Sequence, residues 1–298
     1  MSNINFLHEW TKDGLNLQGV HWESKKKDVC IVCIHGMSGN IIENYFAEVL
    51  GQNLSKNEFG FIFGHNRGYN HINDIKTRKK SDDSGNKTKR IGVVYERFEE
   101  SVYDIDLWVN TAKRIGYKKI ILMGHSLGCN KVINYYSKKN PEGIVAIILA
   151  SPPDMVGLTK IDKYQPNHKE MLQEAKKNVA NNEPRKILDS LWEWYWISSQ
   201  TFLDISEDNC SADNLPLLRN PASFPQLAKL DVPILAFSGE NDDIAIRSLK
   251  KDLELIEKKA VNCPNFTSKI LKGANHNYEN KENELANMIL NWIKKLHI

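Results

Sequence analysis

A serine set between two glycines is the feature of this sequence best suited to carry chemistry. Residues 124–128 read Gly-His-Ser-Leu-Gly, so a glycine stands two positions before and two positions after Ser126. The apolar run 120–123 precedes the pentapeptide, as in a strand buried on both faces, and apolar residues at helical spacing follow it. Glycines at such a strand-to-helix turn let two backbones pass closely and leave the serine projecting from the end of the strand. Ser126 is therefore the candidate nucleophile.

A serine hydroxyl attacks a carbonyl at neutral pH only when a base takes its proton and an anion orients that base. The chain has nine histidines, and His276 is the one in a loop directly after the last apolar strand. His125 is adjacent to the serine, but neighbouring residues of a tight turn point in different directions, which makes it a weaker candidate. Asp242 and Asp243 follow the preceding strand. These residues could supply the base and the anion.

The glycine–serine pentapeptide resembles the nucleophile elbow of the α/β-hydrolase family, and the resemblance covers nearly the whole chain. The Gly-Glu-Asn-Asp segment that ends at Asp242 is similar to the family's Gly-x-x-Asp, and the Gly-Ala-Asn-His segment that ends at His276 is similar to its catalytic-histidine loop. The resemblance implies Ser126 as nucleophile, His276 as base and Asp242 as acid, in the chain order of this fold. Asp243 is the second choice of acid, and a residue such as Asp154, after an earlier strand, is the third.

The resemblance also implies two backbone amides that stabilise the oxyanion formed during acyl transfer. Residues 35–40 read His-Gly-Met-Ser-Gly-Asn directly after an apolar strand, and this loop is similar to that of cinnamoyl and feruloyl esterases. By position the two amides belong to Met37 and Leu127. Residues 119–139, with the loop ahead of them, look like the siderophore-esterase branch of the family.

Strand-like and helix-like segments alternate through most of the chain, which predicts an α/β protein. Apolar runs at 29–34, 59–63 and 144–150 are separated by helical patterns, as in a parallel sheet with crossover helices. Asp-Gly at 13–14, between two strand-like runs, predicts a hairpin at the edge of that sheet. Together with the resemblance, this predicts the α/β-hydrolase fold: a mostly parallel eight-stranded sheet, helices on both faces, and a helical lid inserted after strand 6.

The alternation stops between residues 154 and 230, where the sequence predicts the lid. The core is then made of an N-terminal part, residues 1–153, and a C-terminal part, residues 231–298. Within the lid, helical patterns cover 169–179 and 183–196. The second pattern ends in four aromatic residues that are candidates for lining a substrate pocket or for packing against the core: Trp192, Trp194, Tyr195 and Trp196.

The charge of the chain is concentrated in one segment. The 298 residues carry a formal charge of +3, and residues 76–90 alone hold seven basic and two acidic residues. This segment is rich in Ser, Asp, Gly, Asn and Lys, so we expect a loop that could meet an acidic substrate. The sequence contains neither a nucleic-acid recognition motif nor an apolar run of about 18 residues, so we expect no nucleic-acid partner and no membrane span.

The cysteines indicate the compartment. The chain has five, an odd number, and Cys30 and Cys33 lie three residues apart within one apolar strand, where they face opposite sides. Such a pair cannot share one metal ion, so we expect core residues and no metal site. The N-terminal residues lack the pattern of a secretory leader, and the expected location is the cytoplasm.

These features predict a serine hydrolase that cleaves a carboxylic ester or lactone through an acyl-enzyme, without cofactor or metal. A thioesterase, an amide hydrolase or an acyltransferase would use the same three side chains, and a non-catalytic binding or sensing module is the remaining alternative. The expected partner is a small acyl substrate. The chain length and composition leave the oligomeric state open.

Overall fold

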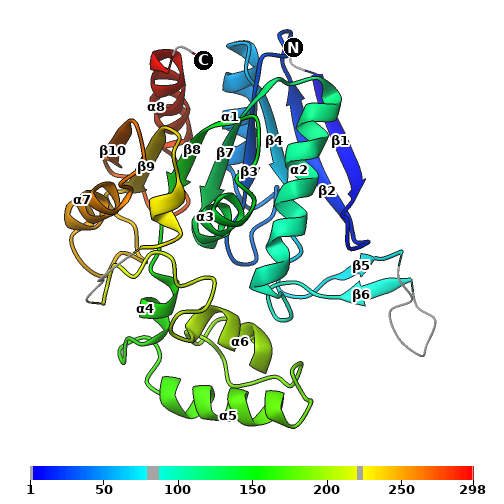
Figure 1. Cartoon of the computed structure of the whole chain (residues 1–298), viewed down its shortest axis with the longest axis vertical. Helices are drawn as coiled ribbons and strands as arrows, with labels where there is room; N and C mark the ends of the chain where they lie inside the picture. The colour runs from blue at the N-terminus through cyan, green and yellow to red at the C-terminus, as the bar shows by residue number, and fades with distance from the viewer. Residues whose placement is uncertain (1–2, 79–86, 220–223, 297) are drawn as a thin grey trace.

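The computed structural model describes residues 3–78, 87–219, 224–296 and 298. Eight strands form one sheet in the order β1-β2-β4-β3-β7-β8-β9-β10 (Figure 1). β2 pairs antiparallel with β1 and β4, and all the other neighbours are parallel. The expected mostly parallel eight-stranded sheet is confirmed. The strands are β1 (Asn3–Trp10), β2 (Asn16–Glu23), β3 (Val29–Ile34), β4 (Gly60–Gly64), β7 (Lys119–His125), β8 (Ile144–Ala150), β9 (Ile234–Gly239) and β10 (Phe266–Leu271).

Helices cover both faces of this sheet, as the sequence predicts. One apolar cluster joins the sheet to α2 (Ser101–Ile115), α3 (Leu127–Lys139) and α7 (Leu249–Lys259). A second cluster on the other face joins it to α1 (Phe46–Lys56) and α8 (Glu282–Lys295). Side chains of successive strand residues point to opposite faces, so each central strand supplies both clusters.

Cys30 and Cys33 lie on opposite faces of β3, one in each apolar cluster, as predicted. Both are free thiols with no exposed surface. They are packing residues of the two core layers.

The segment after β8 is helical and lies to one side of the sheet, below it in Figure 1. The part below the sheet contains α4 (Met155–Thr159), α5 (His168–Ala180) and α6 (Ser199–Ser206), whereas the 3-10 turn η2 (Leu227–Lys229) belongs to the apolar cluster of the sheet and α3. The helices below the sheet have their own apolar cluster, which includes Phe202 and Leu191. The described residues between 154 and 230 form no strand of the main sheet, in agreement with the sequence.

The helix expected over residues 183–196 is wrong. These residues form turns closed by two isolated antiparallel bridges, Ile187 with Ser198 and Leu191 with Tyr195. Trp192 and Glu193 adopt left-handed φ angles of 56° and 58°, which an α-helix does not allow. The two bridges override the helical spacing of the apolar residues in this segment. Its aromatic residues favour extended backbone over helix, which supports such pairing.

The ends of the basic segment pair with each other. β5 (Asp74–Lys76) and β6 (Thr88–Arg90) form a two-stranded ribbon beside the main sheet, where a loop was expected. Arg90 pairs with Asp74 across this ribbon. Residues 79–86, which hold two basic and two acidic residues of the segment, lie outside the described residues.

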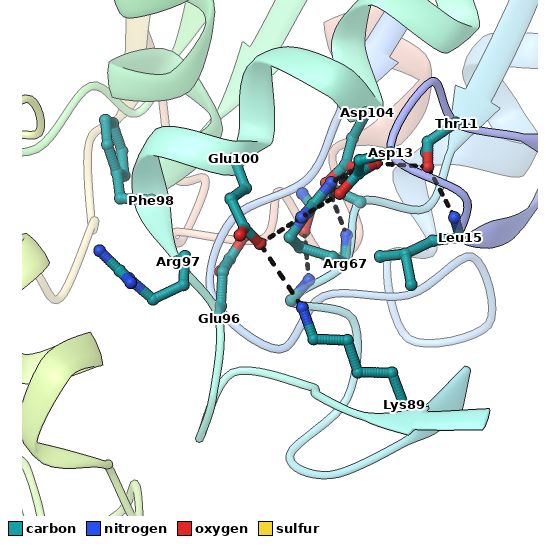
Figure 2. A network of polar contacts seen from close by, with 12 residues as sticks. Thr11, Asp13, Leu15, Arg67, Lys89, Glu96, Arg97, Phe98, Glu100 and Asp104 are labelled. Atoms are coloured by element: carbon teal, nitrogen blue, oxygen red, sulfur yellow. Dashed lines mark hydrogen bonds and ion pairs between the residues drawn. The ribbon is translucent and has the colours of Figure 1, made fainter. Parts of the chain in front are cut away.

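A buried ionic network fixes the sheet edge to the helix layer (Figure 2). The guanidinium of Arg67, after β4, is fully buried and contacts the carboxylate of Asp104 on α2, with Nη2 and Oδ1 2.9 Å apart. Its Nη1 lies 3.0 Å from Asp13 Oδ2, in the β1–β2 turn, and also contacts Glu100. Burying one unpaired charge is strongly unfavourable, so the network holds only while all its members are in place.

Buried histidines with lowered pKa values, among them His21, His65 and His125, predict how stability depends on pH. Burial lowers the pKa of His21 and of His65 to about 4. Burial and the neighbouring histidine His276 lower the pKa of His125 to about 3. Between pH 6.5 and these values the unfolded chain binds protons that the folded chain does not, so stability falls as the pH falls.

We expect the free energy of unfolding to drop between pH 7 and pH 5 by on the order of 1 kcal/mol for each of the three histidines. Urea unfolding at a series of pH values measures this drop. His21→Gln should make the dependence shallower, because a neutral side chain then replaces a titrating one. A free energy of unfolding that stays constant over this range would contradict the prediction.

Among the described residues, none of the helices has the length and apolarity that a bilayer span requires.

Candidate active site

Ser126 lies at the tight turn between β7 and α3, as the sequence predicts. Its backbone angles, φ 55° and ψ −130°, are strained for a residue with a side chain. A Cβ at Gly124 would overlap the carbonyl of Gly128, and a Cβ at Gly128 would overlap the carbonyl of Ile34. Only glycines allow the strand and helix backbones to approach this closely, so the two glycines of the pentapeptide hold the serine in its strained position.

His276 is oriented by Asp242. The imidazole Nδ1 donates a hydrogen bond to Asp242 Oδ1 at 2.9 Å, and the same oxygen accepts the backbone N–H of Ile244 at 3.2 Å. Burial raises the pKa of Asp242, but hydrogen bonds from His276 and from the Ser151 hydroxyl outweigh it, so the pKa lies below its usual 3.8. The carboxylate is therefore ionised and fixes the tautomer in which Nε2 of His276 is free to take a proton.

The other two candidate acids make no hydrogen bond with His276. Asp154 caps α4, where its Oδ1 accepts the N–H of Gly157 at 2.7 Å, and it pairs with Arg219. Asp243 is exposed and has no hydrogen-bond or ion-pair partner among the described residues. The structure thus brings Asp242, and neither alternative, into contact with the histidine.

Asp243 does not cap the helix that follows it in the chain. α7 begins at Leu249, and its cap is Ser248, whose hydroxyl accepts the N–H of Lys251. Asp243 instead lies beside the histidine: its carboxylate, that of Asp242 and a ring nitrogen of His276 have ligand atoms within 4.8 Å of one another. These are the described residues best placed to hold a metal ion, although Nδ1 of the histidine is already hydrogen-bonded to Asp242.

Ser126 and His276 line the same cleft, which has a volume of about 760 Å³. Within the described residues the Ser126 hydroxyl has no hydrogen bond of its own. Catalytic hydrogen bonds are often long before substrate binds, so the missing bond is compatible with a serine–histidine pair. Of the aromatic candidates, Trp192, Trp194 and Tyr195 line the cleft.

Trp196 lies outside this cleft. It is 65% exposed and is not among the residues that line it. It follows the Leu191–Tyr195 bridge, so its side chain leaves the turn in a different direction from that of Tyr195.

The loop that carries Met37 packs directly on the serine. A Cβ at Gly36 would lie 2.7 Å from Ser126 Cβ, so only glycine fits there. Met37 lines the cleft, and Leu127 is the first residue of α3, where a backbone N–H has no acceptor within the helix. Met37 directly follows Gly36, whose backbone packs on Ser126, and Leu127 directly follows the serine in the chain.

Buried polar residues hold this loop and the histidine loop. His35 donates from Nδ1 to the carbonyl of Gly36 at 2.8 Å and accepts the N–H of Asn66 at Nε2 at 3.0 Å. His125 donates from Nε2 to the carbonyl of His276 at 2.9 Å. The histidine beside the serine therefore anchors the backbone of the candidate base. These contacts join segments far apart in the chain, and no local sequence signal indicates them.

Gly36→Ala tests how closely the loop and the serine must fit. The added methyl group would displace Ser126 or the loop, so we expect kcat/KM for an ester to fall by at least about 10²-fold. Gly116→Ala is the matched control: its φ of 110° makes alanine unfavourable, but the added Cβ meets nothing within 4 Å. We expect this control to lower the melting temperature and to leave kcat/KM unchanged. Equal activity of Gly36→Ala and the unmodified protein would show that the loop does not support the site.

Solved structures with the same fold match the whole chain at low sequence identity. The siderophore hydrolase EstB from Aspergillus fumigatus is 15% identical, with a TM-score of 0.67, over 99% of this chain and 98% of that one. Est1E from Butyrivibrio proteoclasticus with bound ferulic acid is 16% identical, with a TM-score of 0.65, over 97% and 99%. The Pyrococcus furiosus esterase Pf2001 is 13% identical, with a TM-score of 0.62, over 100% and 92%. The chain has the α/β-hydrolase fold and resembles esterases in structure.

No curated protein sequence matches the chain. A family model described as "Protein of unknown function (DUF1749)" matches residues 96–296, which include the serine, both aspartates after β9 and the histidine. This match covers more than half of the chain. The protein therefore belongs to the DUF1749 family and is a member built on the α/β-hydrolase fold.

Proposed function

We propose that the protein is a serine hydrolase that cleaves a carboxylic ester or lactone through an acyl-enzyme. One observation carries the proposal. A strained serine at a strand-to-helix turn shares a cleft with His276, whose Nδ1 is hydrogen-bonded to the buried carboxylate of Asp242. The esterases among the structural neighbours support the reaction class.

In the proposed mechanism, Ser126 Oγ attacks the carbonyl carbon while Nε2 of His276 takes the hydroxyl proton. The charge that develops on the carbonyl oxygen is stabilised by the amides of Met37 and Leu127; one such donor contributes about 10²- to 10³-fold in rate. The C–O bond to the alcohol breaks, and His276 gives the proton to the leaving oxygen. Water then attacks the acyl-enzyme by the same route and frees Ser126. Asp242 stabilises the imidazolium of His276 during both the formation and the hydrolysis of the acyl-enzyme.

The cleft lining supports an ester as the substrate. Trp192, Trp194 and Tyr195 offer apolar surface to an acyl or aryl group. We propose that residues 154–230 act as the lid that carries this surface, between the core parts 1–153 and 231–298. The five cysteines are all free, which supports a reducing compartment such as the cytoplasm.

A fluorophosphonate probe tests the nucleophile. We expect one labelled serine, found at residue 126 by peptide mass spectrometry, and no labelling of Ser126→Ala. Ser137→Ala, on the same helix, is the matched control and should label fully. Absence of labelling in a folded protein would overturn the hydrolase and would favour the binding module.

A substrate panel then separates the reaction classes. p-Nitrophenyl esters of increasing chain length, aryl esters, lactones, thioesters and anilides are compared by kcat/KM. The proposal requires the oxygen esters or lactones to exceed the thioesters and amides. Preference for a thioester or an amide would assign the same catalytic residues to a thioesterase or an amide hydrolase.

A further inference from the structure

We propose that the cleft is selective for an ester carrying a positively charged group, such as an ammonium, bound between two carboxylates and an aromatic turn. This inference rests on the proposed hydrolase function and adds the substrate class. It starts from a contrast: the chain carries a formal charge of +3, yet the charged side chains that line the cleft among the described residues are Glu43 and Asp243. No lysine or arginine is among them.

The two carboxylates come from different walls of the cleft. Glu43 lies between the Met37 loop and α1, and Asp243 follows β9. Neither forms an ion pair within the described part of the chain. Glu43 accepts a hydrogen bond from the neutral amide of Asn40, with Nδ2 and Oε2 2.7 Å apart, and Asp243 has no hydrogen-bond partner there. Two carboxylates without a cationic partner attract a cation and repel an anion.

A buried acceptor oxygen stands beside Glu43. Asn44 lines the cleft and is 6% exposed, and its Oδ1 accepts no hydrogen bond from any described residue. This oxygen lies 2.9 Å from the point where a Cβ of Gly39 would stand, and Gly39 also lines the cleft. The oxygen itself has less than 1 Å² of exposed surface, so it acts on a bound cation through the negative end of its amide dipole, which adds to the charge of Glu43 on this side of the cleft.

The aromatic turn, residues 191–195, completes the subsite. It is closed by two hydrogen bonds between Leu191 and Tyr195, and its tip holds Trp192 and Glu193 at positive φ. Each such residue costs about 1–3 kcal/mol and persists only where its surroundings enforce it, often at ligand sites. Gln165, 2% exposed, enforces it: its Oε1 accepts the N–H of Trp192 at 2.6 Å.

The strain has a consequence at the cleft. The strained backbone keeps Trp192 and Trp194 at the wall of the cleft. The Trp194 side chain lines the cleft and is 69% exposed. The ring of His71 stacks on Tyr195 at 5.3 Å between centroids, which fixes the turn against the opposite loop. An exposed indole that shares a cleft with two carboxylates offers an ammonium group both an aromatic face and opposite charge.

Isosteric esters test the charge preference. On the acyl side, p-nitrophenyl 6-aminohexanoate is compared with the heptanoate and the adipate monoester. On the alcohol side, acetylcholine is compared with 3,3-dimethylbutyl acetate. On at least one side we expect kcat/KM for the cationic ester to exceed that of its neutral isostere by about tenfold or more at low salt. The ratio should shrink as salt is raised, because the carboxylates are partly exposed.

Single substitutions test which side chains cause the preference for a cationic ester. Glu43→Gln, Asp243→Asn and Trp194→Leu should each lower the cationic-to-neutral ratio severalfold, and Asp162→Asn, an exposed acid outside the cleft, should leave it unchanged. A ratio near one on both sides, or faster cleavage of the adipate ester, would overturn the inference while the hydrolase function stands.

A binding measurement keeps the inference testable even if no ester is cleaved. Choline and 3,3-dimethylbutan-1-ol are titrated into Ser126→Ala, and tryptophan fluorescence is followed. We expect choline to bind more tightly, and the preference to weaken in Glu43→Gln. Equal binding of the two, or none by choline, would overturn the subsite independently of catalysis.

Discussion

Replacing Ser126 by alanine is expected to lower kcat/KM for a p-nitrophenyl ester by about 10⁴- to 10⁶-fold. The serine oxygen is the atom that forms the acyl-enzyme in the proposed mechanism, and no described side chain next to it could replace it at the turn. Any residual hydrolysis should come from the oxyanion amides and the cleft alone. Initial rates measured with freshly purified protein, against the buffer rate, give the ratio.

Folding of this variant is the first control. Alanine keeps the Cβ and the strained φ of 55°, so the melting temperature should stay close to that of the unmodified protein. Ser137→Ala should keep full activity, since among the described residues the Ser137 hydroxyl donates only to the carbonyl of Asn134 in its own helix. Full turnover by Ser126→Ala would remove the basis of the proposed function.

The second large effect is expected from Asp242→Asn, which should lower kcat/KM by about 10³- to 10⁴-fold near neutral pH. Asparagine can offer its N–H to Nδ1 of His276, which then carries its proton on Nε2 and cannot take one from the serine. The variant also removes the charge that stabilises the imidazolium. Because the pKa of Asp242 lies below 3.8, an acidic limb of the pH–rate profile above about pH 5 belongs to another group.

Asp243→Asn is the matched comparison for this prediction. It changes the neighbouring residue in the same way, and its carboxylate lies near the histidine without a hydrogen bond to it. On a neutral ester we expect a loss below about tenfold, by the removal of one partly exposed charge. A larger loss in Asp243→Asn than in Asp242→Asn would reverse the assignment of the acid.

The parts of the site that could be predicted from sequence are those set by local backbone constraints. Ser126 was found because two glycines, a buried strand and a helix leave one conformation for that turn. His276, Asp242 and Asp243 became candidates because each follows a strand of a parallel sheet, and such strand ends meet at one edge; the choice of Asp242 came from the family resemblance. In each case the residues that set the backbone conformation lie within a few positions of the candidate side chain in the sequence.

The rest depends on contacts between distant segments. The spacing of apolar residues predicted a helix over 183–196, but the contact of Trp192 with Gln165, 27 residues earlier, holds a strained turn there, which the local Leu191–Tyr195 pairing closes. The role of His125 as an anchor for the His276 loop likewise requires two segments 151 residues apart. The spacing of apolar residues indicates which face of a helix or strand is apolar. It does not indicate which distant residues that element contacts.

The Arg67 network affects which parts of the protein unfold together. An antiparallel edge hairpin next to a chain terminus would ordinarily open by itself, long before the parallel strands separate. Here the turn of that hairpin holds Asp13 against a guanidinium that is wholly inside the protein and that also contacts α2. Peeling the hairpin away would leave that cation short of a counter-ion. The amino-terminal ribbon should therefore exchange its amide hydrogens in step with the body of the sheet, as part of one cooperative unit.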